Sequence, residues 1–106
     1  MNPYQIIRQA IIDKKVIVAV YDGLERIMCP HVIGTNKQGR EQALCYQFEG
    51  ESKSRAIEPD GSPVNWRCID IAKLSSVTAR DGEWHSAPNH SRPQTCVANI
   101  DVEVQL

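Results

Sequence analysis

The sequence predicts a mainly β domain, a small barrel of five or six antiparallel strands preceded by a short N-terminal helix. Three observations predict this class. A segment with one apolar face at helical spacing occupies residues 3–14, β-branched runs separated by turn residues follow over 16–77, and the tail over 96–106 alternates every second residue. Because closing a sheet removes its unpaired edges, short hairpin-linked strands of this kind favour a barrel.

The length and charge of the chain limit the function classes. A chain of 106 residues forms one domain with one modest core. Its 12 basic and 13 acidic side chains leave a net charge of −1, which excludes a strongly basic protein that coats nucleic acid by bulk charge. Residues 1–57 carry eight basic and six acidic side chains, so the first half has room for a local anion site without a basic tract.

The helix is expected over residues 3–14. Asn2 can cap it, and Pro3 stands at the first helical position, which proline favours. Its apolar residues recur at helical spacing, at Tyr4, Ile7, Ala10 and Ile11. One face is therefore apolar and must pack on the remainder of the domain.

The first strands are expected on either side of a tight turn. Residues 16–21 form a β-branched run, and Asp22-Gly23 after it is a strong hairpin signal. Residues 24–28 are the expected partner strand, and Pro30 should end its pairing or place it at an edge, because proline cannot donate to a ladder. A third strand is expected over 41–48.

The second half alternates shorter strands with loops. Residues 49–63 form a polar loop longer than a connection requires, which is where function is often found. Alternation over 66–71 places Trp66 and Cys68 on one face and Arg67 and Ile69 on the other. A strand over 74–77 follows. In the tail the apolar residues share one face, at Ile100, Val102, Val104 and Leu106.

The cysteines and the apolar runs predict a compartment. Four cysteines, at positions 29, 45, 68 and 96, lie far apart and lack the paired spacing of a zinc site. No secretion signal is visible, and the longest apolar run has six residues, against roughly 20 for a membrane span. We expect a cytoplasmic protein, outside the membrane, with no metal and no disulfide, and with Cys45 and Cys68 buried as small apolar residues.

Three blocks of residues carry a resemblance to a known family. They are Ala10-Ile11 followed by Val16, Val18, Val20 and Tyr21, then Arg26, Pro30 and Ile33, and finally Arg67, Ile69, Ile71, Lys73 and Leu74. In this order residues 7–74 resemble the WYL domain family, which has an Sm-like, SH3-type small β-barrel after a short helix. Two features depart from the family. The namesake Trp-Tyr-Leu falls on Gln42-Ala43-Leu44, and a single helix stands where family members often have a DNA-binding helix-turn-helix domain.

The resemblance implies part of a site. WYL domains act as effector sensors, and their barrels bind negatively charged ligands, including nucleic acid, through basic and polar residues on one face. At matching positions this sequence has Arg67, Lys73 and, less closely, Tyr21. The alternative for both cations is a solvated strand residue paired with a nearby carboxylate such as Asp70.

Other candidates come from the residues themselves. Ser54 and Arg55 lie in the long polar loop, where a hydroxyl and a guanidinium could bind phosphate. Trp66 stands beside Arg67 and could stack on a nucleotide base or pack at the rim of the core; the sequence leaves both open. For Trp84 the sequence favours packing.

Together these features predict a non-enzymatic regulatory module that binds an anionic ligand, nucleic acid or nucleotide, chiefly through Arg67 and Lys73. The sequence contains no nucleophile elbow, phosphate loop or zinc-protease helix, so neither an enzyme nor a cofactor is expected. The alternative is a self-assembling or partner-binding barrel whose alternating tail adds to a neighbour's sheet.

Overall fold

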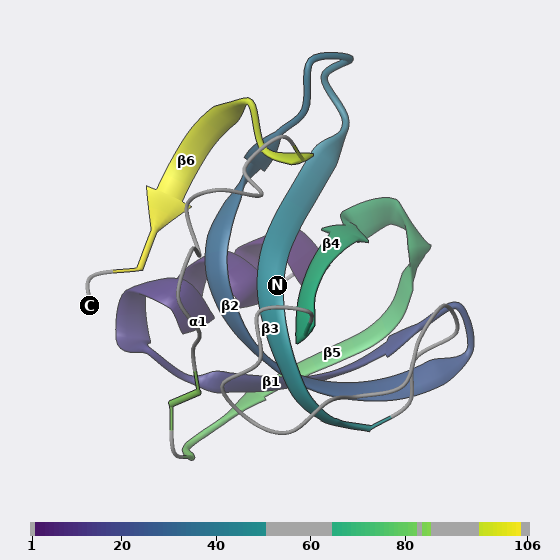
Figure 1. Ribbon diagram of the computed structural model, residues 1–106, viewed down its shortest axis with the longest axis vertical. Coiled ribbons are helices and arrows are strands. Elements are labelled where there is room, and N and C mark those ends of the chain that lie inside the picture. The colour runs from purple at the N-terminus through teal and green to yellow at the C-terminus, as the bar shows by residue number, and fades with distance from the viewer. Residues whose placement is uncertain (1, 51–64, 83, 86–95, 105–106) are drawn as a thin grey trace.

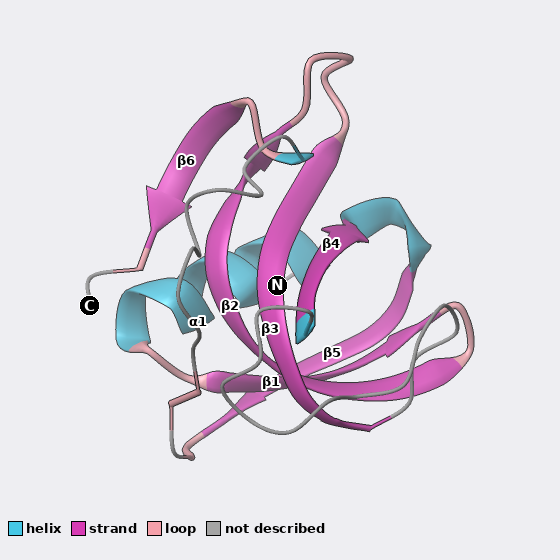
Figure 2. Ribbon diagram, in the orientation of Figure 1, coloured by secondary structure: helices cyan, strands magenta, loops and turns pink. Residues whose placement is uncertain are grey.

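The computed structural model describes residues 2–50, 65–82, 84–85 and 96–104. These residues form one short N-terminal α-helix and six antiparallel strands, as Figures 1 and 2 show, which confirms the predicted mainly β class; the sheet is open where the sequence predicted a closed barrel. The elements in chain order are α1 (Pro3–Asp13), β1 (Val16–Tyr21), β2 (Leu24–Thr35), β3 (Glu41–Gly50), β4 (Trp66–Asp70), the 3₁₀ helix η2 (Ile71–Lys73), β5 (Leu74–Arg80) and β6 (Asn99–Glu103).

The predicted N-cap at Asn2 begins α1. The Asn2 side chain accepts a hydrogen bond from the backbone N–H of Gln5 at 2.9 Å, and the Gln5 side chain accepts one from the Asn2 backbone at 3.1 Å. The helix ends where Lys14 adopts a left-handed conformation with φ of 53°. Its buried face packs against β2, β5 and β6.

The strands form one curled, open sheet in the order β4-β3-β2-β1-β5, and β6 adds to β2 (Figure 1). The two ends of this order, β4 and β5, are joined covalently by η2, and no ladder connects them among the described strands. Asp22 and Gly23 both have positive φ, at 53° and 77°, as a two-residue hairpin turn of type I′ requires. The turn therefore fixes the register that places Arg26 opposite Ala19.

Pro30 interrupts the pairing of β2 on one side only. Pairing with β1 stops at Met28, but pairing with β3 continues through Pro30 opposite Cys45, with a register shift between Pro30 and Val32. The expectation that Pro30 would end the pairing of this strand or place it at an edge therefore holds on the β1 side and is wrong on the β3 side. From Val32 onward β6 replaces β1 as the neighbour, so β2 changes partner along its length.

The main core lies between α1 and the inner face of the sheet. Its fully buried members come from α1 and from β1 to β4, among them Ile7, Ile11, Ile17, Met28, Ile33, Cys45 and Ile69. Two smaller clusters lie on the outer face, one around Tyr46 and Cys29 and one around Val32, Leu44 and Val97. The central strands are therefore covered on both faces, which explains why β2 has a long run of buried residues.

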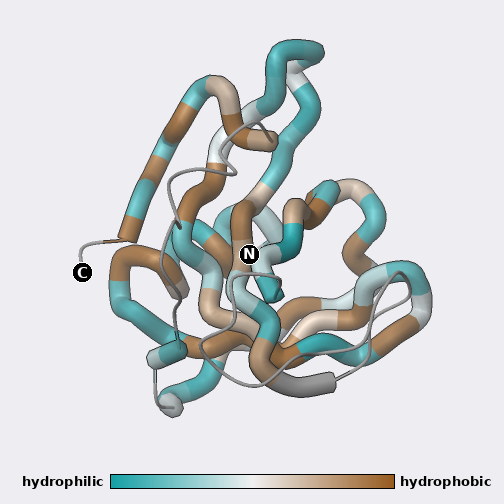
Figure 3. Tube along the Cα trace, viewed as in Figure 1, coloured by the Kyte–Doolittle hydropathy of each residue, from teal (hydrophilic) through white to brown (hydrophobic). Residues whose placement is uncertain are grey.

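Hydrophobic and hydrophilic positions alternate along β6, as the tail pattern predicts (Figure 3). The predicted face is graded in exposure: Ile100 is 46% exposed, Val102 is half-buried and Val104 belongs to the main core. Leu106, the last member of the predicted face, lies outside the described residues. No helix of the described residues has the length and apolar character that crossing a membrane needs.

Gly34 allows β6 to approach β2. A Cβ atom at this position would overlap the carbonyl oxygen of Asn99 and lie 3.0 Å from Cγ1 of Val97. Because the nearest atom belongs to the backbone of Asn99, the first residue of β6, rotation of a side chain cannot relieve the overlap. Gly34 is required by the closeness of the two backbones.

We expect Gly34→Ala to lower the free energy of unfolding by about 1–3 kcal/mol, because the backbone of Asn99 must move to admit a methyl group. Urea unfolding followed by circular dichroism measures the change. Ser76→Ala, at an exposed position on β5, is the control and should leave the midpoint nearly unchanged. Equal midpoints for both variants would contradict the close approach.

A disulfide between Cys68 and Cys96 corrects two expectations. The sequence predicted no disulfide and a buried Cys68, whereas Cys68 is exposed on the outer face of β4 and bonded to the segment before β6. Spacing could not show this pair, because 28 residues separate them and the tertiary fold alone brings their Cα atoms to 6.1 Å. Cys29 and Cys45 are free and buried, as expected for Cys45, and burial raises the pKa of the Cys45 thiol.

Candidate anion-binding site

Arg26 is a cation on the inner face of the sheet. It lies two residues before Met28, so alternation along β2 turns both side chains toward the core. The residue is 4% exposed, and its guanidinium carbon lies 4.9 Å from the centre of the Tyr21 ring. Its Nε is buried and has no hydrogen-bond partner among the described residues. Arg26 thus carries a buried charge held against an aromatic ring.

Tyr21 connects two distant strands behind this guanidinium. It ends β1, where it pairs with Leu74 of β5. Its hydroxyl oxygen accepts a hydrogen bond from the backbone N–H of Asp70, at the end of β4, at 3.3 Å. Tyr21 therefore bridges β1 and β4 and supports the Arg26 guanidinium on its ring.

Arg67 is also turned inward. It lies on β4 opposite Cys45, on the same face as Ile69, as the alternation predicts, and it is 7% exposed. Its Nη1 donates to the carbonyl oxygen of Trp66 at 3.2 Å. Arg67 is therefore not the solvated strand residue of the alternative interpretation. Asp70, the carboxylate suggested for it, instead binds Arg40 at 3.1 Å.

Lys73 lies at the exposed end of η2, next to the residue that pairs with Tyr21. The fold therefore brings Tyr21, Arg26 and Lys73 to the region where β1 ends and β5 begins. The two cations in this region, Arg26 and Lys73, come from segments that lie far apart in the sequence. Ser54 and Arg55 lie outside the described residues.

Trp66 points away from this group. It alternates with Arg67 on β4 and faces the outer side of the sheet, where its ring lies 4.7 Å from that of His31 and 5.2 Å from that of Tyr46. It is half-buried in the outer clusters. The structure therefore places Trp66 in packing, and it does the same for Trp84, which lies 4.9 Å from the His31 ring.

Cysteine and histidine side chains also gather on the outer face. Cys29 Sγ accepts a hydrogen bond from the backbone N–H of His85 at 3.2 Å, and the His85 ring stacks on Phe48 at 3.8 Å. The Nδ1 of His31 lies 2.8 Å from the carbonyl oxygen of Cys29 and donates to it, since a carbonyl only accepts. Within the described part of the chain, no group of three or more His, Cys, Asp or Glu side chains is placed to hold a metal ion.

Sequence reasoning missed Arg26 as a site residue, although a signal for it exists. The Asp22-Gly23 turn fixes the hairpin register, and that register sets Arg26 opposite Ala19 in an apolar strand. A cation at an inward position of a strand is the anomaly that marks it. The same argument identifies Gln47 as a polar residue at an inward position of a strand. It is fully buried opposite Met28.

Several residues that carry the WYL resemblance lie on the inner face together, including Tyr21, Arg26 and Arg67. The resemblance rests on these residues and their spacing. No family model matches the chain, and no curated protein and no solved structure matches it.

Proposed function

We propose that this protein is a non-enzymatic regulatory module that binds an anionic ligand, a nucleic acid or a nucleotide, as the resemblance to WYL effector-sensing domains implies. The observation that supports this most is Arg26. Its guanidinium is almost fully removed from water, and within the described residues it takes part in no ion pair. A phosphate or carboxylate of a ligand would supply the missing negative charge.

The energetics favour a functional reason for this arrangement. Taking one ion out of water costs several kcal/mol in a folded protein. The contact with the Tyr21 ring returns about 0.5–2 kcal/mol, so it does not offset that cost. Folded proteins accept such local violations mainly at functional sites.

Guanidinium groups suit this ligand class. Their planar N–H donors match the oxygens of a phosphate, whereas an ammonium such as that of Lys73 acts as a point charge. With a net charge of −1, binding must come from local cations rather than from a general field. Three contacts, from Arg26, Arg67 and Lys73, predict a slope of log affinity against log salt of about −2 for a single strand.

Fluorescence anisotropy with short labelled single-stranded DNA and RNA, at low and moderate salt, tests the proposal. We expect Arg67→Ala to weaken binding more than about tenfold, because a hydrogen bond to a charged group contributes about 1.5–3 kcal/mol. Arg67→Lys should keep part of the affinity, and circular dichroism checks that both variants fold.

Two results would overturn the assignment. Equal affinity in Arg67→Ala would remove Arg67 from the site. If neither nucleic acid binds at low salt, and a nucleotide added to the unlabelled protein changes neither its melting temperature nor its fluorescence, the module does not bind this class of anion.

A second candidate function is self-assembly through β6. Ile100 is exposed on this strand, and among the described strands β6 pairs with β2 alone, so none of them covers its other edge. An open edge with an apolar residue can pair with a strand of another chain.

A further inference from the structure

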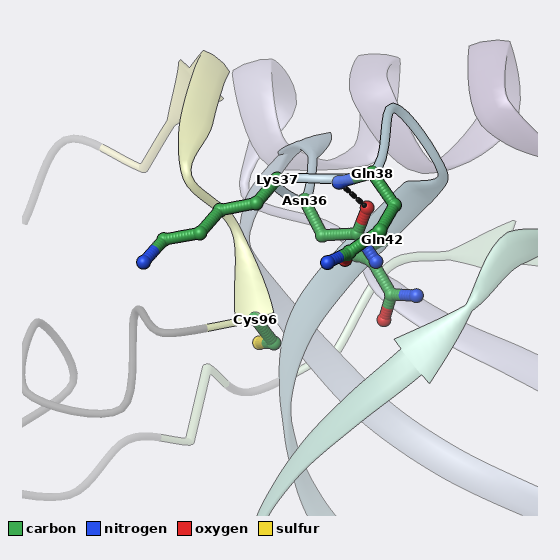
Figure 4. Close-up of a pocket in the computed structure, with 5 residues that line it drawn as sticks. All are labelled: Asn36, Lys37, Gln38, Gln42 and Cys96. Atoms are coloured by element: carbon green, nitrogen blue, oxygen red, sulfur yellow. Dashed lines mark hydrogen bonds between the residues drawn. The ribbon is translucent and has the colours of Figure 1, made fainter.

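Cys96, which is bonded to Cys68, lines a cavity of about 350 Å³ (Figure 4). Asn36, Lys37, Gln38 and Gln42 line this cavity together with Cys96. Cys68 itself is exposed on β4, and Cys96 is half-buried. Both sulfur-bearing residues are thus within reach of solutes, and one of them forms part of a cavity wall.

The opposite wall of the cavity is a preformed turn between β2 and β3. The Asn36 side chain accepts hydrogen bonds from the backbone N–H groups of Gln38 and Arg40, both at 3.0 Å, and the N–H of Gly39 donates to the Asn36 carbonyl at 3.0 Å. These bonds hold the cavity-lining residues of the turn above Cys96 (Figure 4). This wall of the cavity is therefore held by hydrogen bonds within the turn.

The two other cysteines differ from this pair. Cys29 and Cys45 are fully buried, so neither can reach a thiol in solution without unfolding. Thiol chemistry on the folded protein is confined to the Cys68–Cys96 bond.

We propose that Cys96 is a site of thiol–disulfide exchange with a small thiol, and that breaking its bond to Cys68 releases the attachment of β6. This inference does not depend on the proposed anion binding. Exposed disulfides of this kind are the ones that act as labile or regulatory bonds.

The exchange balances with a dithiol as the reductant. Its thiolate attacks Sγ of Cys96, a mixed disulfide forms, and the Cys68–Cys96 bond breaks with its electron pair leaving on Cys68, which takes a proton from water. The second thiol of the reductant then attacks the reductant sulfur that is bonded to Cys96. A disulfide forms within the reductant, and Cys96 leaves as a thiolate. Two electrons pass to the protein, and the dithiol ends as a disulfide.

Lys37 is the cation among the cavity-lining residues, and its side chain extends to one side of the cavity, away from Gln38 and Gln42 (Figure 4). A nearby ammonium favours both the attacking thiolate and the Cys96 thiolate that leaves in the second step. The amide side chains of Asn36, Gln38 and Gln42 add hydrogen-bond donors for the polar groups of a peptide-like thiol.

The disulfide is one of few attachments of the segment that follows it. Val97 packs between Val32 and Leu44, and Val104 packs into the main core. β6 itself pairs with β2 over Val32–Thr35. Without the covalent bond, residues 97–104 are held by this ladder, by backbone hydrogen bonds from Ala98 and Val104, by packing of their valines and by contacts with α1.

Contacts with α1 complete the attachment. The Tyr4 hydroxyl donates to Asp101 at 2.7 Å, and Arg8 Nε donates to the same carboxylate at 3.1 Å. Burial, together with this hydrogen bond, raises the pKa of Tyr4 to about 12, and the hydrogen bond from Tyr4 lowers the pKa of Asp101. These contacts are exposed, so they loosen readily once the covalent bond is broken.

Hydrogen exchange on the wild-type protein tests the consequence. After reduction with dithiothreitol, amides in residues 97–104 should exchange at least about tenfold faster, while those of β1 keep their protection. The Cys68→Ser, Cys96→Ser double variant should exchange quickly in this segment with or without dithiothreitol. Unchanged exchange in the reduced wild type, or a bond that resists dithiothreitol until the protein unfolds, would overturn the proposal.

Mass spectrometry tests the site of attack. Glutathione should form its adduct on Cys96, and Lys37→Gln should slow adduct formation about threefold or more. Lys15→Gln is the matched control, because Lys15 pairs with Asp81 away from the cavity. This variant should leave the rate of adduct formation unchanged. An adduct found on Cys68 instead, or equal rates for the two variants, would overturn the assignment of Cys96 and of Lys37.

Discussion

Replacing Arg26 by methionine should weaken binding of single-stranded DNA or RNA at least about tenfold and raise the free energy of unfolding by about 1–3 kcal/mol. The two effects have opposite signs because one charge causes both. In the proposed complex the guanidinium would contribute donors to the ligand, whereas in the free protein it is buried without an anion among the described residues. Methionine keeps the length of the side chain and can place its sulfur against the Tyr21 ring.

Arg80→Met is the matched control. Arg80 lies exposed on β5, so this variant removes the same charge without changing a buried group. Its unfolding free energy should stay within about 0.5 kcal/mol of the wild type. Anisotropy titrations and urea unfolding measure both properties on the same samples. If Arg26→Met loses stability and keeps its affinity, Arg26 is a structural residue and the proposed site is wrong.

Deleting residues 97–106 should lower the free energy of unfolding by at least about 3–5 kcal/mol and leave the chain largely unfolded at room temperature. Val97 is 2% exposed and Val104 is 6% exposed, and burying each contributes about 1.5–3 kcal/mol. The deletion also uncovers Val32 and Leu44 and leaves β2 with an open edge. Far-UV circular dichroism and urea unfolding measure the loss.

This deletion separates the two candidate functions. A truncated protein that stays folded and changes from oligomer to monomer would contradict the expected loss and support self-assembly through the tail. Ile100→Ser gives an independent reading, because Ile100 is exposed and its replacement should cost little stability. A change of sedimentation from oligomer to monomer in this variant would identify an interface.

The elements that the sequence predicts best are those with local causes. The cap at Asn2 and Pro3 defines α1, and the Asp22-Gly23 turn defines the β1–β2 hairpin and its register. The continuation of β2 through Pro30 was not predictable in this way. Pairing continues there with β3 while pairing with β1 stops at Met28, and a proline in the sequence does not show on which side of its strand each neighbour lies.

The candidate site was predicted in part for the same reason. Alternation placed Arg67 with Ile69 on one face of β4, but it could not show that this face is the interior. Recognising Arg26 as inward-facing required the register of the hairpin. Assigning Trp66 to packing required its ring contacts with His31 and Tyr46. The disulfide depends on the tertiary approach of segments 28 residues apart, which periodicity does not encode.

The change of partner along β2 also has a consequence for synthesis of the chain. The edge at Val32–Thr35 receives β6 only after Asn99, 64 residues beyond Thr35, has been made. At about 5–20 residues per second, the ribosome needs roughly 3–13 s to supply that strand. Once Gly50 has been made, α1 and β1 to β3 are all present while β6 is still missing, with Val32 and Ile33 beside an uncovered row of backbone donors and acceptors. The nascent chain is therefore most open to pairing with other chains in the seconds before its final strand emerges.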